Sequence, residues 1–273
     1  MKVSGREVAD AISKNLKKEI ENLKVTPCLA IILTAEDPAS RLYVNFKEKR
    51  AKEIGVAVRH FEFSENQLPD LEKTIHKLNA DQSVHGIIIQ YPIYRSWNFD
   101  EVFSKIDPKK DVDGFSDEAP FRGATALGVW EMLTAFALLE GFSETGKFLQ
   151  NKNIVLLGKG KTAGGPIRDL LLERKISFIL IDSKTENPDK LIKEADIIIS
   201  ATGRKNIITG DKIRKGSFVI GVGVGKEEGE VYGDIEESTV SKIAKLYCPT
   251  IGGIGPLTIV CLLKNVIQSA SWV

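Results

Sequence analysis

The sequence predicts an α/β protein of two domains, the second of them a Rossmann-like dinucleotide-binding domain. Short apolar runs, typical of buried strands, alternate with amphipathic stretches, typical of helices, and this alternation indicates βαβ units with mostly parallel sheets. The pattern restarts after residues 140–150 with an apolar run at 154–157 and a glycine-rich turn at 158–165. The length of 273 residues is comfortable for two cores.

The first half of the chain begins with an amphipathic helix, because apolar residues recur every four positions from Val8 to Ile20 and Ser4 can cap its start. Pro38 opens the second helix and Gly55 stops it. We expect helices at 4–23, 38–54, 69–79, 98–106 and 129–139, and strands at 28–33, 56–63 and 85–90.

The second half repeats the alternation. We expect strands at 154–157, 176–181, 197–200 and 217–222, and helices from the glycine turn to about 174, at 188–195 and at 256–270. The last helix is apolar on several sides, so we expect it to pack back onto the first domain. The predicted domains are therefore 1–140, completed by 256–273, and 141–255.

Composition excludes several classes of partner. The chain has 38 Lys plus Arg against 37 Asp plus Glu, which gives no reason to expect nucleic acid or an anionic membrane. No apolar run approaches the roughly 18 residues of a membrane-spanning helix, and no secretory signal is visible at the N-terminus. The three cysteines sit in apolar surroundings, which favours a reduced, cytoplasmic protein. The three histidines fit no metal-ligand spacing, so we expect no metal.

The turn at 158–165 is a candidate phosphate site, because a glycine turn between a strand and a helix gathers backbone N–H groups at one point. Gly158, Gly160 and Gly164 are spaced one residue wider than the usual dinucleotide fingerprint. A P-loop is excluded because Val155 stands where that motif needs glycine. A turn that only joins a strand to a helix is the alternative.

Candidate catalytic residues follow the strands of the first domain. Tyr43 and Lys47 are four residues apart and so share a helix face. Gln90 ends an apolar strand, where α/β folds often bind ligands, and Asp113 lies in a polar loop. Taken singly, each feature has an ordinary structural explanation. Spacing alone favours a surface pair for Tyr43 and Lys47 and a turn for the Asp113 loop, and Gln90 could equally make a strand-end hydrogen bond.

In combination, the motifs are more specific. They are Tyr43-x-x-x-Lys47, Gly86-Ile87-Ile88-Ile89-Gln90-Tyr91-Pro92, Lys110-Asp111-Val112-Asp113-Gly114 and Gly252-Gly253-Ile254-Gly255-Pro256-Leu257-Thr258. With the glycine turn, they make the chain resemble the bifunctional methylenetetrahydrofolate dehydrogenase/cyclohydrolase (FolD) family over nearly its whole length. The resemblance implies two α/β domains around a cleft, folate on the first domain, a nicotinamide cofactor on the second, and a homodimer.

The resemblance also implies residue roles. Tyr43 would stack on the pterin, Lys47 would be the central catalytic group with Gln90 beside it, and Asp113 would accept hydrogen bonds from pterin N–H groups. Gly255 and Pro256 would shape the folate site. The implied cofactor contacts are Gly158, Lys159, Gly160, Lys161, Ser183, Lys184, Thr202 and Val224.

The implied activity is oxidation of 5,10-methylenetetrahydrofolate and hydrolysis of the methenyl product to 10-formyltetrahydrofolate, a part of one-carbon metabolism. Hydride transfer needs only close contact and exclusion of water. Hydrolysis needs a base, and both burial and a nearby cation would lower the pKa of Lys47 enough to leave it neutral. A monofunctional dehydrogenase and a non-catalytic nicotinamide-binding protein are the alternatives.

Some positions depart from the family pattern. Residues 123–126 read Gly-Ala-Thr-Ala instead of Pro-Cys-Thr-Pro, Lys159 replaces Arg, and Ile251 replaces Pro. Asp182 replaces His at the end of the second strand of the second domain, where a carboxylate normally binds the ribose 2′-OH of NAD. Because three groups, Lys159, Ser183 and Lys184, favour a 2′-phosphate, we expect NADP, with NAD as the alternative.

Overall fold

The structure is a computed structural model in which the chain folds into two compact units. The residues that it describes are 1–34, 37–227 and 230–272. The three-stranded unit comprises Ala11–Ala124 and Ile259–Val273, and the five-stranded unit comprises Met1–Asp10 and Thr125–Thr258. The first helix, α1 (Gly5–Glu21), and the last, α10 (Ile254–Ala270), each contribute residues to both units.

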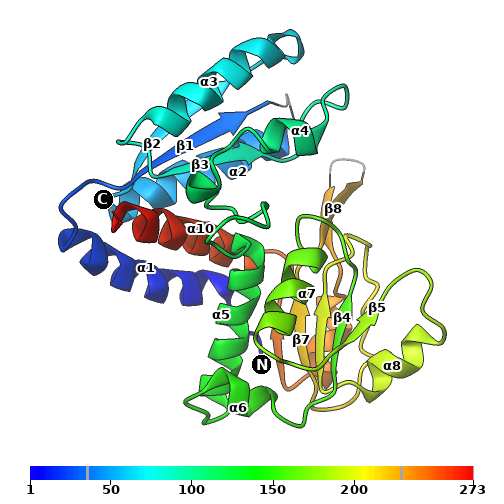
Figure 1. Cartoon of the computed structure of the whole chain (residues 1–273). Coiled ribbons are helices and arrows are strands. Elements are labelled where there is room, and N and C mark those ends of the chain that lie inside the picture. The colour runs from blue at the N-terminus through cyan, green and yellow to red at the C-terminus, as the bar shows by residue number, and fades with distance from the viewer. Residues whose placement is uncertain (35–36, 228–229, 273) are drawn as a thin grey trace. The chain divides into compact units, whose positions relative to one another are not determined.

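The three-stranded unit contains one parallel sheet with the strand order β2–β1–β3 (Figure 1). Its other elements are helices α2 to α4 and two short 3-10 turns. The bounds are β1 (Cys28–Leu33), α2 (Pro38–Ile54), β2 (Ala57–Glu62), η1 (Glu65–Gln67), α3 (Leu68–Ala80), β3 (Gly86–Gln90), α4 (Phe99–Phe103) and η2 (Pro108–Lys110). The periodicity of the sequence predicted these strands and longer helices to within a few residues.

The two faces of this sheet carry different partners, because successive side chains of a strand point to opposite faces. Ile87 and Ile89 of β3 pack in a core with Leu71 and Ile75 of α3. The opposite face is the one that Gly86 shares with Ile88 and Gln90. A side chain at Gly86 would collide with Val112 and would come within 3.1 Å of Val266 of α10, so the C-terminal helix packs on that face.

Helix α2 is fixed at both ends by local chemistry. The Asp37 carboxylate accepts a hydrogen bond from the Ser40 N–H at 2.9 Å, and Pro38 occupies the first turn. Gly55 ends the helix in the left-handed conformation, with φ of 98°, which glycine adopts without steric cost. The caps fix where the helix begins and ends, and the face that it buries, which includes Val44 and Ala51, turns Lys47 inward.

Asn265 of α10 joins the C-terminal helix to the loop that follows β3. Its side chain is 4% exposed, and Nδ2 donates to the carbonyl oxygens of Val112 at 2.8 Å and Arg122 at 3.2 Å. The expected return of the last helix to the first half of the chain is therefore present from Ile259 onward. Val273, the last residue of the expected segment 256–273, lies outside the described residues.

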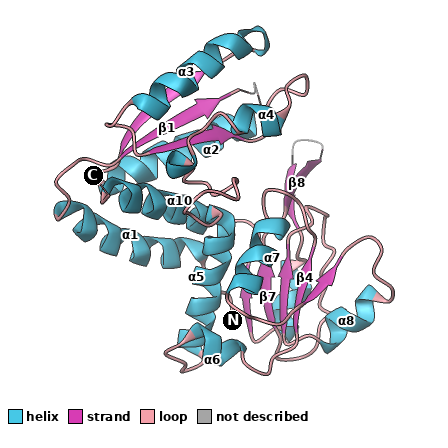
Figure 2. Ribbon diagram, in the orientation of Figure 1, coloured by secondary structure: helices cyan, strands magenta, loops and turns pink. Residues whose placement is uncertain are grey.

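The five-stranded unit contains a parallel sheet with the order β10–β7–β6–β4–β5 and a separate antiparallel hairpin, β8–β9 (Figure 2). The strands are β4 (Ile154–Leu157), β5 (Ile179–Ile181), β6 (Ile197–Ser200), β7 (Phe218–Gly221), β8 (Val224–Glu227), β9 (Glu230–Gly233) and β10 (Leu246–Cys248). The helices are α5 (Ala124–Leu139), α6 (Thr145–Leu149), α7 (Gly164–Glu173), α8 (Pro188–Glu194) and α9 (Glu237–Ile243).

The order of this sheet confirms the Rossmann-like prediction. Numbered along the unit, its parallel strands run 2-1-3-4-5, which is a doubly wound order. Such sheets bind ligands at the carboxyl ends of the two strands where the order reverses, here β4 and β6. The pattern of the sequence did not indicate the hairpin, α6, α9 or β10, because segments of three to seven residues show too little periodicity.

The two compact units divide earlier than the expected boundary at residues 140/141, with the break at 124/125. The reason is α5, which packs within the five-stranded unit. The ring of Phe136 lies 6.0 Å from that of Phe218, and the Arg174 guanidinium lies 4.0 Å from the Trp130 ring centre. The first ten residues also belong to this unit, because Val3 and Tyr247 are joined by a backbone hydrogen bond.

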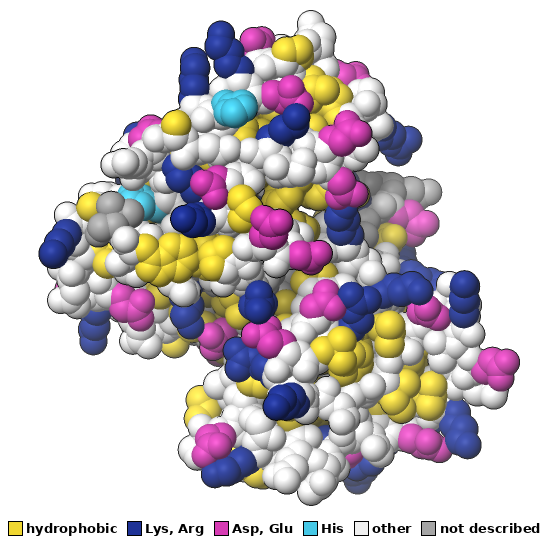
Figure 3. Space-filling model, viewed as in Figure 1, with side chains coloured by type: hydrophobic (Ala, Val, Ile, Leu, Met, Phe, Trp, Pro, Cys, Tyr) yellow, Lys and Arg dark blue, Asp and Glu magenta, His cyan; other side chains and the backbone are white. Residues whose placement is uncertain are grey.

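The surface carries mixed charge. On the face that Figure 3 shows, basic and acidic side chains are interspersed, in agreement with a net charge of +1. Within the described ranges, none of the helices has both the length and the apolarity to cross a membrane.

Replacing Asn265 with Leu tests the link between α10 and the loop after β3. The variant deprives the buried Val112 carbonyl of its donor, so we expect the free energy of unfolding to fall by about 1–3 kcal/mol. The matched control is Gln268→Leu, an amide-to-leucine change at an exposed site on the same helix, which we expect to stay within about 0.5 kcal/mol of wild type. Urea unfolding measures both, and equal stabilities of the two variants would contradict the assigned role.

Candidate active site

Lys47 and Gln90 form the centre of the candidate site in the three-stranded unit. Lys47 points from α2 and is 7% exposed, and its Nζ donates to Oε1 of Gln90 at 2.9 Å. Gln90 is the last residue of β3, and its Nε2 donates to the carbonyl of Tyr91 at 2.8 Å. That second bond turns the amide so that its oxygen faces the lysine. The structure therefore brings together two residues that lie 43 positions apart.

The electrostatics at Lys47 favour a neutral amine. Burial lowers the pKa of Lys47 below its ordinary 10.5, and the negative charge of Asp113 partly opposes this. For Asp113 the same environment acts in reverse: burial raises the pKa of its carboxyl group, and Lys47 lowers it. Each side chain thus shifts the pKa of the other. The motifs predicted that both residues belong to one site.

The loop that carries Asp113 is held by its neighbours in the motif. Asp111 is fully buried and accepts hydrogen bonds from the N–H groups of Gly114 at 2.9 Å and Ser116 at 2.8 Å. Lys110 donates to two backbone carbonyls at the end of α3 and just beyond it, both at 2.7 Å. The Lys110-Asp111 pair therefore shapes the loop, which leaves Asp113 as the carboxylate that faces Lys47.

Tyr43 lies one helical turn before Lys47 on α2 and keeps 39% of its surface exposed. Partial burial raises the pKa of its phenol, so the ring stays neutral near pH 7. An exposed aromatic ring beside a buried amine is suited to stacking on a flat heterocycle. The stacking role of Tyr43 stays a prediction.

Gly255 and Pro256 lie in the first turn of α10, in the part assigned to the five-stranded unit. The glycines before them are required by the backbone. Gly252 has φ of 75°, and a side chain on Gly253 would overlap the carbonyl oxygen of Pro249. The contribution of Gly255 and Pro256 to a folate site stays a prediction.

The glycine turn in the five-stranded unit connects β4 to α7 as expected. Gly158 has φ of 91°, and a side chain there would overlap the carbonyl oxygen of Ala201, just after β6. A side chain on Gly164 would overlap the backbone of Gly158. Gly160 faces open space. The turn thus brings the backbone after β4 against the backbone after β6, and Gly160 leaves room for a phosphate to approach.

Lys159 forms an ion pair with Asp182 that the sequence did not indicate. Lys159 Nζ lies 2.8 Å from Oδ2 of Asp182, and the Lys184 N–H donates to Oδ1 at 2.9 Å. The hydrogen bond from Lys159 is the largest cause of the lowered pKa of the Asp182 carboxyl group. The sequence argument set Lys159 against Asp182 as independent charges, whereas in the structure they neutralise each other. Ser183 and Lys184, which follow Asp182 in the chain, are exposed, and so is Lys161 of the glycine turn.

Thr202 and Val224, the other predicted cofactor contacts, lie after β6 and at the start of β8. Val224 is 46% exposed. Thr202 donates both its N–H and its hydroxyl to Asp234, at 2.8 Å and 3.0 Å. These donors are therefore already in use, so a contact from Thr202 to the cofactor would come from its other atoms.

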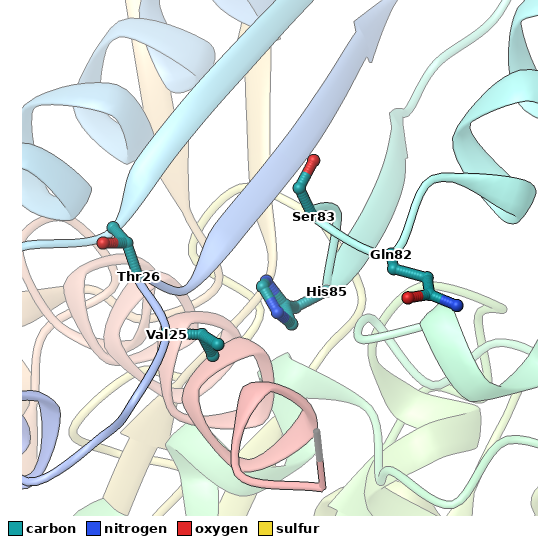
Figure 4. A pocket seen from close by; sticks show the side chains of 5 residues that line it. All are labelled: Val25, Thr26, Gln82, Ser83 and His85. Carbon is teal, nitrogen blue, oxygen red and sulfur yellow. The ribbon is translucent and has the colours of Figure 1, made fainter.

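A pocket of about 450 Å³ lies elsewhere in the three-stranded unit (Figure 4). Val25 and Thr26 line it from the segment before β1, and Gln82, Ser83 and His85 from the segment before β3. These are the amino ends of the strands, the opposite edge of the sheet from Gln90. The pocket is therefore separate from the candidate site.

Comparison with known proteins matches both halves of the chain to one family. Residues 3–113 match the model of the tetrahydrofolate dehydrogenase/cyclohydrolase catalytic domain, and residues 124–273 match the model of the NAD(P)-binding domain. The chain belongs to the tetrahydrofolate dehydrogenase/cyclohydrolase family. The resemblance drawn from the motifs is thereby confirmed, and with it the assignment as an enzyme of a bifunctional family.

Individual relatives match this chain over nearly its full length and over nearly all of their own. The Bifunctional protein FolD of Acetivibrio thermocellus is 36% identical over 98% of this chain and 96% of its own. The crystal structure of the Campylobacter jejuni FolD enzyme has a TM-score of 0.90 and 32% identity and covers 99% of this chain and 98% of that one. The Trypanosoma brucei FolD structure, complexed with NADP and an inhibitor, has a TM-score of 0.89 and 28% identity and covers 99% and 97%.

Two buried polar residues near the predicted site residues were missed by sequence reasoning. Asn265 and Asp234 are buried polar side chains that hold loops next to the predicted sites. Their partners lie 30 or more positions away, so no local pattern marks them. In the part of the chain that the structure describes, no group of three His, Cys, Asp or Glu side chains could hold a metal ion.

The buried Asp111 makes stability depend on pH. Burial raises the pKa of its carboxyl group from an ordinary 3.8 to about 6. The folded state therefore favours the protonated form, and this contribution is present below pH about 4 and lost as the pH rises through about 6. Relative to Asp111→Asn, we expect the wild type to lose about 2.4 kcal/mol of unfolding free energy between pH 4 and pH 7. Urea unfolding at each pH measures the difference, and a constant difference would contradict the prediction.

Proposed function

We propose that the enzyme oxidises 5,10-methylenetetrahydrofolate to the 5,10-methenyl form with NADP and hydrolyses that product to 10-formyltetrahydrofolate. The observation that carries this proposal is the buried Lys47 amine, held by Gln90 and coupled to Asp113. The three-stranded unit would bind the folate and the five-stranded unit the nicotinamide cofactor, in line with the family models that match these parts of the chain.

For the oxidation, the enzyme has to position its substrate and exclude water. NADP, when bound, accepts the hydride. Tyr43 would stack on the pterin, and Asp113 would accept hydrogen bonds from pterin N–H groups, which orients the methylene carbon. No side chain has to move a proton, because the folate nitrogens supply the electrons that stabilise the methenyl cation.

For the hydrolysis, Lys47 would act as the general base. A neutral amine can donate an N–H to Gln90 Oε1 and still have a lone pair for the proton of the attacking water. The cationic substrate lowers the pKa of Lys47 further by like-charge repulsion, so the base is most available when its substrate is bound. Gln90 fixes the direction of the amine, and Asp113 limits how far its pKa falls.

Replacing Lys47 with Met tests this role. Removing a general base typically costs about 10²–10⁴-fold, so we expect hydrolysis of methenyltetrahydrofolate to fall by at least about 100-fold. The matched control is Lys49→Met, an exposed lysine of the same helix, which should keep wild-type hydrolysis. The absorbance of the methenyl species reports both steps. It should rise and then fall with the wild type, as oxidation forms the species and hydrolysis removes it, and it should fall only slowly with Lys47→Met. Undiminished hydrolysis in Lys47→Met would remove Lys47 from its role.

We further propose that NADP is preferred over NAD. Exposed Ser183 and Lys184 adjoin the Lys159–Asp182 pair, and a 2′-phosphate could draw Lys159 away from Asp182. Glycines 158 and 164 allow the close backbone approach that a dinucleotide needs. A relative that is 28% identical has been solved with NADP. Asp182 works against the phosphate and should make the preference modest.

Replacing Asp182 with Asn tests the cofactor preference. The change removes the negative charge and releases Lys159, so we expect the ratio of NADP to NAD affinity to rise about tenfold. Asp189→Asn, which breaks another surface Lys–Asp pair of the same unit, is the control and should leave the ratio unchanged. Fluorescence titrations with both cofactors measure the ratio. Tighter binding of NAD than NADP by the wild type would overturn the proposed preference.

We also propose a cytoplasmic homodimer. The three cysteines are free and buried, as expected in a reducing compartment. Light scattering would give about twice the chain mass of 30.1 kDa for the dimer.

A further inference from the structure

Asp234, which follows β9, is a fully buried carboxylate that binds the segment after β6. Its Oδ2 accepts from the Ser200 hydroxyl at 2.7 Å and the Thr202 N–H at 2.8 Å. Its Oδ1 accepts from the Thr202 hydroxyl and the Arg204 N–H, both at 3.0 Å. Each oxygen thus receives one hydroxyl and one backbone N–H. Four donors satisfy the buried charge, and the segment 200–204 wraps around it.

This arrangement admits no amide in place of the carboxylate. If Asn replaced Asp234, either orientation would point its NH2 group at a backbone N–H, of Thr202 or of Arg204. A hydroxyl can rotate to accept instead, but a backbone N–H cannot. Gly223 is also fitted to the carboxylate, because a side chain there would collide with both Asp234 oxygens. The site is therefore specific for an anionic acceptor with two equivalent oxygens.

The segment held by Asp234 occupies the functional edge of the sheet. It begins at the carboxyl end of β6, and the doubly wound order reverses between β6 and its neighbour β4. The Ala201 carbonyl lies against Gly158 of the glycine turn. The backbone that Asp234 holds is thus packed on the backbone predicted to approach the dinucleotide.

We propose that Asp234 is a positioning residue for the nicotinamide cofactor. It fixes the backbone of residues 200–204 beside the glycine turn without itself touching the cofactor, and the site loses affinity when this segment is released. The proposal rests on the proposed function in one respect only, that the five-stranded unit binds a nicotinamide dinucleotide.

The experiment compares Asp234→Asn with a carboxylate at the opposite edge of the same sheet. Asp196 precedes β6, accepts from the Asn153 N–H at 2.8 Å and pairs with Arg214, so Asp196→Asn removes similar interactions at the amino ends of the strands. Calorimetric titration of NADP and of NAD measures affinity directly. Hydrolysis of methenyltetrahydrofolate, which needs no nicotinamide, reports whether the three-stranded unit is intact.

We expect Asp234→Asn to weaken cofactor binding about tenfold, which is usual for a residue that acts on a site without contacting the ligand. The KM for the cofactor should rise by the same factor, with kcat at saturating cofactor and hydrolysis near wild type. Asp196→Asn should keep wild-type affinity. Ser200→Ala, a milder change that removes one donor to Asp234, should weaken binding about threefold.

Wild-type affinity in both Asp234→Asn and Ser200→Ala would overturn the proposal, as would an equal loss in Asp196→Asn. If Asp234→Asn fails to fold, Ser200→Ala decides alone. Failure of the proposed function has a different signature: the wild type itself would then bind neither NADP nor NAD, or would bind them without turnover.

Discussion

The hydrogen bond between Lys47 and Gln90 is the interaction on which the geometry of the candidate site depends. A buried lysine is costly when charged, and among the residues that the structure describes no carboxylate forms a hydrogen bond or ion pair with the amine. The amide of Gln90 satisfies the amine as a neutral group, and Asp113 acts on it only through its charge. The combination leaves Lys47 buried and oriented, with its pKa lowered, which is the direction that the proposed role as a general base requires.

Both ends of that hydrogen bond are held by ordinary structural features. The buried face of α2 turns Lys47 inward, and the parallel register of β3 with β1 brings Gln90 to the carboxyl edge of the sheet. Asp111 holds the loop that presents Asp113. The reactive group is therefore part of a rigid scaffold, which suits a site that must orient a substrate and water at one carbon atom.

In the five-stranded unit two carboxylates, one half-buried and one fully buried, accept hydrogen bonds from the backbone after the strands. Asp182 pairs with Lys159 at the end of β5, and Asp234 gathers the donors after β6. The first pair neutralises a charge beside the glycine turn, and the second carboxylate holds the backbone next to that turn. The family match gives an NAD(P)-binding domain, whereas the proposed roles of these two carboxylates concern how they would tune the binding.

The sequence alone determined the two α/β cores, most of the longer helices and the family, and it proposed the catalytic residues, whose roles stay predictions. Periodicity and motifs are local, so they survive in a single sequence. Only the tertiary structure decided that α5 belongs with the five-stranded unit, that Lys159 and Asp182 neutralise each other, and that Thr202 gives its donors to Asp234. These outcomes depend on contacts between residues far apart in the chain, and the geometry that brings them together is set by packing rather than by spacing.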